Sequence, residues 1–119
     1  MRRCTLADLT RGGRHVLEGL VPGRFLAPGG LSFKAPGERS HDAGFRCPAC
    51  DGRCRHVHGD AEVFVILQGH ARIEVDGVSH DLAPGDVVVC EPGEDHHLVA
   101  DPADPCVNLW LNASDHPHP

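Results

Sequence analysis

The stretch CRHVHGDAEVFVILQG, residues 54–69, decides how this chain is to be interpreted. It places His56 and His58 one residue apart, then Glu62, then a mostly apolar run that ends at Gly69. On a β-strand, residues two apart point to the same side, so the two histidines are expected to project together, with Glu62 in the same parity. Imidazole and carboxylate groups are common ligands of divalent transition metals. The stretch therefore predicts a metal-binding strand.

A second stretch, GDVVVCEPGEDHHLVA at residues 85–100, adds a strand, a Pro-Gly turn and His96. Three imidazoles and one carboxylate form a set that suits a divalent metal with one or two coordination positions left open. His97 is expected to point to the opposite face, which makes it a weak candidate ligand. The histidines predicted to lie at the surface are His15, His70, His80, His116 and His118.

Together the two stretches resemble the paired motifs of the cupin superfamily, and of its small single-domain metal-binding members in particular. The first motif, His-x-His, three residues, Glu, six residues, Gly, is matched without a gap. The second is matched at Gly85, Pro92, Gly93 and His96. Ala100 replaces the asparagine that often ends this second motif, and the glycine usual before the first motif is out of register. Neither departure touches a ligand position.

The resemblance implies a jelly-roll β-barrel that binds one divalent metal, which would be Fe, Mn, Ni, Cu or Zn. The implied ligands are His56, His58, Glu62 and His96.

The rest of the chain favours the same all-β fold class. Glycine (14) and proline (10) divide it into short runs separated by turn residues. In ARIEV, residues 71–75, apolar and charged side chains alternate, and Asp76–Gly77 is a hairpin signal. We expect a single domain over 1–119, with a core of about 24–112 and a frayed tail at 113–119.

Composition restricts the function classes. The net charge of −6 argues against a nucleic-acid partner, and no apolar run approaches the length of a membrane span. The N-terminus lacks the apolar core of a secretory signal, so the expected location is the cytoplasm. All eleven Lys and Arg lie at or before Arg72, whereas the remainder carries ten acids. Mutual neutralisation within one fold is the expected reason.

The segment FRCPACDGRCRHVH, residues 45–58, carries three closely spaced thiols at Cys47, Cys50 and Cys54. They could bind a structural zinc with His41 as a fourth ligand. A Cys47–Cys50 disulfide or free thiols are the alternatives. Cys90 is expected to be a small buried hydrophobe, and Cys4 and Cys106 have no evident partner.

Two functions are consistent with these features. The first is a metal-dependent enzyme acting on a small, carboxylated molecule: a dioxygenase first, an isomerase or lyase otherwise, with Glu62 as a catalytic base. The chain has no tyrosine, which lowers the lyase option. The second is a non-catalytic module that senses a small molecule, a metal or redox state. The residues expected to line the barrel are Phe64, Ile66, Ile73, Val87, Val89, Leu98 and Trp110.

We also expect a homodimer, because small barrels of this kind commonly cover their edge strands with a partner. The run RFLAPGGLSFKA, residues 24–35, is the segment predicted to cross over.

Overall fold

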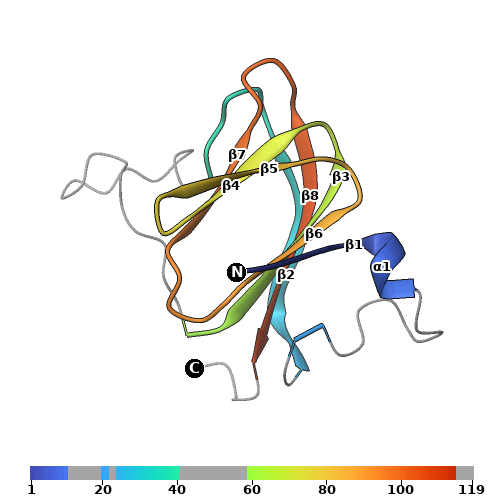
Figure 1. Ribbon diagram of the computed structural model, residues 1–119, viewed down its shortest axis with the longest axis vertical. Helices are drawn as coiled ribbons and strands as arrows, with labels where there is room; N and C mark the ends of the chain where they lie inside the picture. The colour runs from blue at the N-terminus through green and yellow to red at the C-terminus, as the bar shows by residue number, and fades with distance from the viewer. Residues whose placement is uncertain (11–19, 22–23, 41–58, 115–119) are drawn as a thin grey trace.

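The computed structural model describes residues 1–10, 20–21, 24–40 and 59–114. Two antiparallel sheets face each other (Figure 1). The larger sheet contains, in spatial order, β1 (Arg2–Thr5), β6 (Asp86–Cys90), β3 (Ala61–Gln68), β8 (Cys106–Ser114) and β2 (Arg24–Lys34). The smaller contains β5 (Val78–Leu82), β4 (Ala71–Val75) and β7 (His96–Ala100). The predicted all-β fold class is confirmed, and the arrangement is consistent with a jelly-roll barrel.

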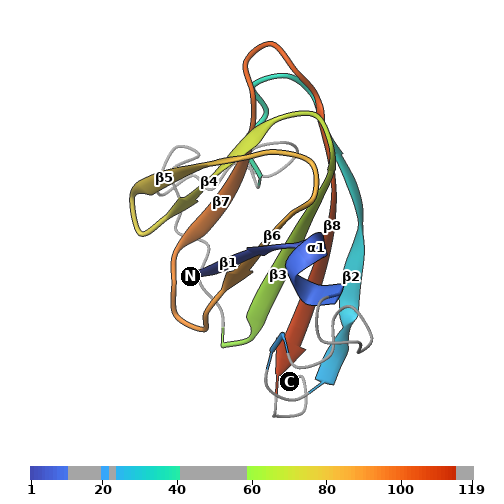
Figure 2. The ribbon, with the colours of Figure 1, turned by 45° about the vertical axis from the view of Figure 1, so that its right-hand side comes forward.

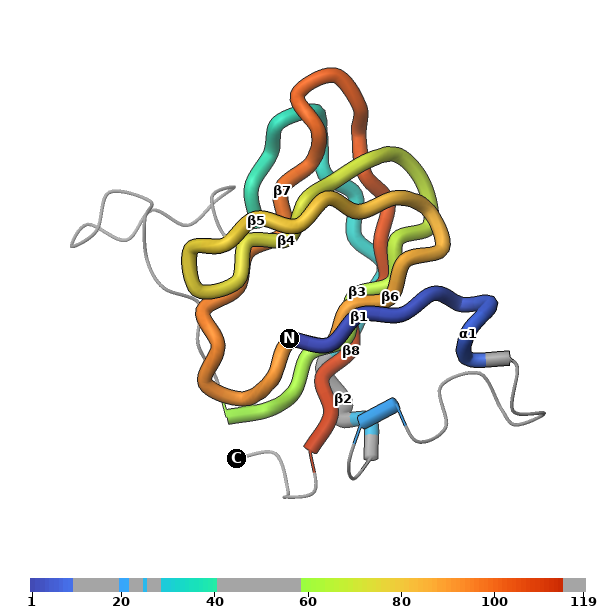
Figure 3. Tube along the Cα trace, in the orientation of Figure 1, coloured from blue at the N-terminus to red at the C-terminus, as the bar shows by residue number. Residues whose placement is uncertain are grey.

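Apolar side chains fill the space between the two sheets. Phe64 and Ile66 of β3 pack against Ile73 of β4 and Leu98 of β7, and the last three are fully buried. Val88 and Cys90 contribute from β6, and Trp110 packs against this core from β8. In the tube view the smaller sheet lies across from β3, β6 and β8, so the core sits between them (Figure 3).

A second apolar cluster covers the outer face of the larger sheet. It joins Val63 and Val65 of β3 to Val87 and Val89 of β6, and Leu6 and Leu9 pack against it from the N-terminal segment. Leu9 belongs to α1 (Leu6–Thr10), the one helix among the described residues. Figure 2 shows α1 on the side of the larger sheet, away from β4 and β5. Strand β3 is therefore buried on both faces.

This second cluster corrects part of the predicted barrel lining. Phe64, Ile66, Ile73, Leu98 and Trp110 belong to the core between the sheets, as predicted. The assignment of Val87 and Val89 to the barrel interior was wrong, because they face the N-terminal segment. The run of three valines in β6 has no polar alternation, since both of its faces are buried, and its inward face was therefore not apparent.

The hairpin predicted at Asp76–Gly77 joins β4 to β5. Both residues have positive φ, 48° and 81°, as a two-residue type I′ turn requires. That combination suits the Asp-Gly pair, because asparagine, aspartate and glycine tolerate the left-handed region best. Here local sequence and observed turn agree.

Ion pairs join the basic and acidic parts of the chain. Arg3 Nη2 lies 2.8 Å from Asp86 Oδ2, and Arg39 Nη2 lies 3.0 Å from Glu74 Oε2. Arg2 Nε pairs with Glu91 Oε1 at 2.6 Å. Such surface pairs each contribute about 0–1 kcal/mol, so their main effect is to balance charge. The expected mutual neutralisation is confirmed for these pairs.

None of the described helices is both long and apolar enough to cross a membrane.

Candidate metal centre

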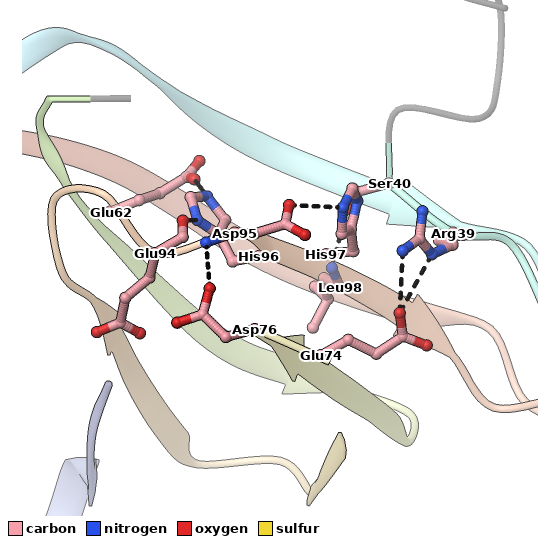
Figure 4. Close-up of polar contacts among 10 residues, drawn as sticks. All are labelled: Arg39, Ser40, Glu62, Glu74, Asp76, Glu94, Asp95, His96, His97 and Leu98. Atoms are coloured by element: carbon pink, nitrogen blue, oxygen red, sulfur yellow. Dashed lines mark hydrogen bonds and ion pairs between the residues drawn. The ribbon is translucent and has the colours of Figure 1, made fainter. Parts of the chain in front are cut away.

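Glu62 and His96 meet between the two sheets, although 34 residues separate them in sequence. Glu62 is the second residue of β3, and His96 is the first residue of β7. Oε2 of Glu62 lies 2.5 Å from Nε2 of His96, and the side chains are 9% and 2% exposed (Figure 4). The fold thus brings one carboxylate and one imidazole from the two motifs into direct contact in a buried position.

The backbone contact of Nδ1 shows that this nitrogen of the His96 ring carries a hydrogen. Nδ1 lies 3.0 Å from the carbonyl oxygen of Glu94. A carbonyl oxygen can only accept a hydrogen bond, so Nδ1 carries the hydrogen and donates it. A backbone partner of this kind orients metal-ligating histidines and leaves Nε2 as the coordinating atom. Phe64 packs edge-on against the ring, with centroids 5.9 Å apart, and restricts it further.

This geometry fits a bound cation. With the hydrogen on Nδ1, a neutral His96 presents the Nε2 lone pair to a carboxylate oxygen only 2.5 Å away. Two lone pairs at that distance repel, and both atoms are buried, so either a hydrogen on Nε2 that is donated to the carboxylate or a metal cation must lie between them. A divalent metal bound here would take the place of that hydrogen, and Glu62 and His96 would be two of its ligands. The donor set therefore suits the metal that the motifs imply.

Two further polar groups neighbour Glu62 through strand pairing. Its register partners are Asn112 on β8 and Cys90 on β6, and directly opposed residues share a face of the sheet. Oδ1 of Asn112 is buried and has no hydrogen-bond partner among the described residues. Burial first, and then the nearby carboxylates, raise the pKa of the Cys90 thiol to about 12. Cys90 therefore stays a neutral thiol, as expected for a buried hydrophobe.

The chain on either side of residues 41–58 is anchored near this pair. Ser40 exchanges two hydrogen bonds with Leu98, two residues from His96: its N–H donates to the Leu98 carbonyl, and its Oγ accepts from the Leu98 N–H, both at 2.8 Å. Figure 4 shows Ser40 and Arg39 beside β7. At the other end, Gly59 is three residues before Glu62. Both flanks of the segment that carries the other candidate ligands thus lie close to the candidate centre.

The remaining predicted ligands lie outside the described residues. These are His56 and His58 of the metal set, and His41, Cys47, Cys50 and Cys54 of the possible zinc site. Within residues 1–10, 20–21, 24–40 and 59–114, no three His, Cys, Asp or Glu side chains converge closely enough to hold a metal. Of the four predicted metal ligands, the described residues therefore include two, Glu62 and His96.

Three histidines that are not predicted metal ligands occupy other positions in the fold. His97 is buried on the face of β7 opposite His96, and its Nε2 lies 3.1 Å from Asp95 Oδ1. His70 is exposed, and its hydrogen bond to Asp104 is the main cause that raises its pKa. His80 is half-buried on β5. The predicted opposite orientation of His97 and the surface position of His70 are confirmed.

Sequence reasoning missed four polar residues that face the space between the sheets. Asn112 lies opposite Glu62, and on β2 and β8 the buried Lys34 donates hydrogen bonds to the half-buried Ser32 and to the buried Asn108. No recognisable motif marks these four residues in the sequence. Only the register of β8 against β3 and β2 shows that they share one face of the larger sheet. The one available signal was that Lys34 is the sole lysine of the sequence.

Comparison with known proteins agrees with this geometry. The family model described as "Cupin domain" matches residues 48–112, which include both motifs and more than half of the chain. Among curated proteins, none matches this sequence.

Solved structures show the same fold. A cupin protein from Bacteroides fragilis is 20% identical, with a TM-score of 0.59 over 76% of this chain and 68% of that one. A Cupin 2 conserved barrel domain protein from Salinispora arenicola is 23% identical, with a TM-score of 0.57 over 76% and 73%. A predicted oxalate decarboxylase from Thermotoga maritima is 20% identical, with a TM-score of 0.55 over 71% and 64%. From the family match, the two motifs and the shared fold, we conclude that this chain belongs to the cupin family.

Proposed function

We propose that this cupin holds one divalent transition metal through His56, His58, Glu62 and His96. The observation that carries the proposal is the buried contact between Glu62 Oε2 and His96 Nε2, which brings a carboxylate and an imidazole of the two motifs together. His56 and His58 are the upstream residues of the same motif, and they precede Glu62 in the parity of a strand.

We further propose that the protein is an enzyme acting on a small carboxylated molecule, with dioxygenation the first candidate reaction. A metal held by four side chains supplies Lewis-acid polarisation and open positions for substrate and dioxygen. Phe64 packs against His96, and Ile66 and Leu98 belong to the same apolar core. Isomerase and lyase reactions remain alternatives within the same class of site. Because the chain has no tyrosine, a lyase that needs a tyrosinate base is a weaker candidate than a dioxygenase.

Glu62 is the proposed catalytic base. A carboxylate acts as a base where it can hold a proton within hydrogen-bond reach of the reacting atom. The Glu62 side chain is 9% exposed, so a proton that its other carboxylate oxygen accepts would stay inside the buried centre. Asn112 Oδ1, opposite Glu62 in the register, is a buried acceptor positioned to receive a donor hydrogen from a bound molecule.

Oxygen uptake tests the enzymatic proposal. Iron-loaded protein is expected to consume dioxygen in the presence of one member of a panel of small organic acids and thiols, measured with an oxygen electrode. A His96→Ala variant treated with iron in the same way is the control and should show only background uptake. Metal-loaded protein that consumes no oxygen with any panel member would argue against a dioxygenase.

A non-catalytic sensing module is the second candidate. It is favoured by the largely apolar core between the sheets, which offers few groups for acid–base work. Calorimetry separates the two candidates: a sensor binds a panel member tightly and returns it unchanged, whereas an enzyme yields a product detectable by mass spectrometry.

The cysteine segment gives a prediction about metal stoichiometry. If Cys47, Cys50 and Cys54, with His41, hold a structural zinc, the wild type binds two ions per chain and a Cys47→Ser, Cys50→Ser variant binds one. Structural zinc requires thiolates, so a mercurial should release the same ion while the core between the sheets stays folded. Elemental analysis on both proteins decides the question. One ion in each would reject the zinc site in favour of free thiols or a disulfide.

We also propose a homodimer formed through β2. Among the described strands, β2 is the edge of the larger sheet, and it pairs there with β8 alone. Its outward side chains Leu31 and Phe33 are 68% and 65% exposed, an unusual position for two large apolar groups on neighbouring sites of one strand face. A second copy would bury them and cover the open edge.

Light scattering checks this association. The wild type is expected to be a dimer at micromolar concentration, and a Leu31→Glu, Phe33→Glu variant a monomer. Val78→Glu is the matched control, because Val78 is also exposed (58%) but lies on β5 in the other sheet. It should remain dimeric. A monomeric wild type, or dissociation by the Val78 change alone, would contradict the proposed interface.

A further inference from the structure

The only lysine of the chain is buried in the fold. Lys34 ends β2, and its side chain is 7% exposed. It lies opposite Cys106 of β8, a fully buried residue of the core between the sheets. Lysine is almost never buried in proteins unless its charge is compensated. The ten other basic residues are all arginines. A single buried lysine is therefore a feature that needs a physical reason.

The contacts of Lys34 do not compensate its charge. Nζ donates to Ser32 Oγ at 3.0 Å and to Asn108 Oδ1 at 3.5 Å. Both acceptors are neutral, and an ammonium has three hydrogens to donate. Across the described part of the chain, no ion pair joins Nζ to a carboxylate. Asn108 is fully buried and Lys34 is 7% exposed, whereas Ser32 is half-buried.

Burial lowers the pKa of Lys34, and it is the largest influence on that group. The carboxylates of Glu38 and Glu62 act in the opposite direction through their negative charges, without overcoming it. A buried ammonium with only neutral partners is costly, and the cost falls when an anion binds beside it. The described residues supply neutral acceptors that position Nζ, and their carboxylates act on it only from a distance, so a bound anion could supply the counter-charge in direct contact.

The strand register places this group along the same interior face as the candidate metal centre. On β8, Asn108 and Asn112 share a face, and Asn112 is the partner of Glu62. Four residues of a strand span about 13 Å. Trp110 lies between Asn108 and Asn112 on β8. Its Nε1 is 3.3 Å from the position that a side-chain carbon added to Gly30 would occupy. Glycine at position 30 thus leaves space for the indole ring of Trp110 on this face of β8.

We propose that Lys34 binds the carboxylate of a small organic acid and is the anion-recognition group of the interior between the sheets. Ser32 and Asn108 act as positioning residues that hold Nζ toward that anion. The choice of an organic acid rests on the proposed function, in which the rest of such a molecule extends toward the candidate metal centre. The anion site itself does not require the metal.

The single lysine makes the test direct. Protein labelled with ¹⁵N-lysine gives one side-chain ammonium resonance, that of Lys34. In metal-free protein, malonate is expected to shift this resonance with saturation in the millimolar range or below, whereas malonamide, its neutral analogue, leaves it unmoved. No response to malonate, or an equal response to malonamide, would overturn the proposal. This measurement needs no variant and so does not depend on one folding.

Variants separate recognition from a purely structural role. Lys34→Met should lose malonate binding by calorimetry at least tenfold, with a melting temperature equal to or above that of the wild type, because a buried uncompensated charge is removed. Arg72→Met removes one positive charge from a half-buried site on the other sheet and should bind malonate like the wild type. A destabilised Lys34→Met protein that still binds malonate normally would assign Lys34 to the scaffold alone.

The same experiments keep this inference distinct from the metal proposal. A lysine response in metal-free protein, combined with elemental analysis that finds no metal site, supports the anion site and rejects the metal. Malonate binding that appears only after metal loading, with the lysine resonance unmoved, supports the metal and rejects the role of Lys34.

Discussion

Replacing His96 with alanine is expected to weaken metal binding by about 100-fold or more, since even partners that only orient metal ligands change affinity by 10- to 100-fold. The imidazole is 2% exposed and directs Nε2 at Glu62, so no solvent ligand can take its exact place within the buried pair. Competition with a chromophoric chelator measures the affinity. An unchanged affinity would remove His96 from the metal centre.

His97→Ala is the matched control for this experiment. His97 is adjacent in sequence and also buried, but its side chain lies on the opposite face of β7, where Nε2 contacts Asp95 Oδ1. The two substitutions delete the same side chain from neighbouring positions of one strand, so a general loss of stability would affect both. We expect metal affinity to fall only for His96→Ala. A similar fall in both variants would show that the effect comes from damage to β7.

Replacing Gly69 with alanine is expected to destabilise the fold by about 3 kcal/mol. Gly69 ends the first motif with φ of 78°, in the region that disfavours side chains. A side-chain carbon there would lie 1.7 Å from the backbone oxygen of Pro105, just before β8. Because backbone cannot rotate aside as a side chain can, the β3–β4 turn or the start of β8 must move. Urea denaturation measures the change.

Gly77→Ala is its control. Gly77 has a similar φ of 81°, but nothing lies within 4 Å of the added carbon. It should therefore show only the backbone cost of the left-handed region, about 1 kcal/mol. If the two substitutions lower the free energy of unfolding equally, the close approach of Pro105 adds no cost, and the backbone around position 69 has moved to accommodate the methyl group.

Much of this architecture could be predicted because local and tertiary signals coincide. The Asp-Gly hairpin depends on backbone conformations that few residues tolerate, so the turn was readable from two residues. The alternation in residues 71–75 appears unchanged as the buried and half-buried positions of β4. His96 and Glu62 could be paired in advance because the resemblance to the two cupin motifs carries their spatial relation.

Other features depend on tertiary contacts that no local pattern encodes. The inward face of β6 could not be assigned because the N-terminal segment buries its outer face as well, which removes alternation. Lys34 has a charged side chain at the end of a strand, where exposure is the usual outcome. Only the pairing of β2 with β8 places it beside Asn108. The Asn112 acceptor was missed for the same reason, since Glu62 is its neighbour through the sheet and not through the sequence.

The most direct test of the central claim is the metal content of the wild-type protein, measured by elemental analysis as purified and after incubation with iron or zinc followed by removal of excess ion. Affinity alone follows the Irving–Williams order, so the purified ion is expected to be nickel, copper or zinc as readily as iron. At least one tightly bound divalent ion per chain, lost in His96→Ala and retained in His97→Ala, is the result that the contact between Glu62 and His96 predicts. Protein that binds no divalent metal before or after incubation would contradict the account.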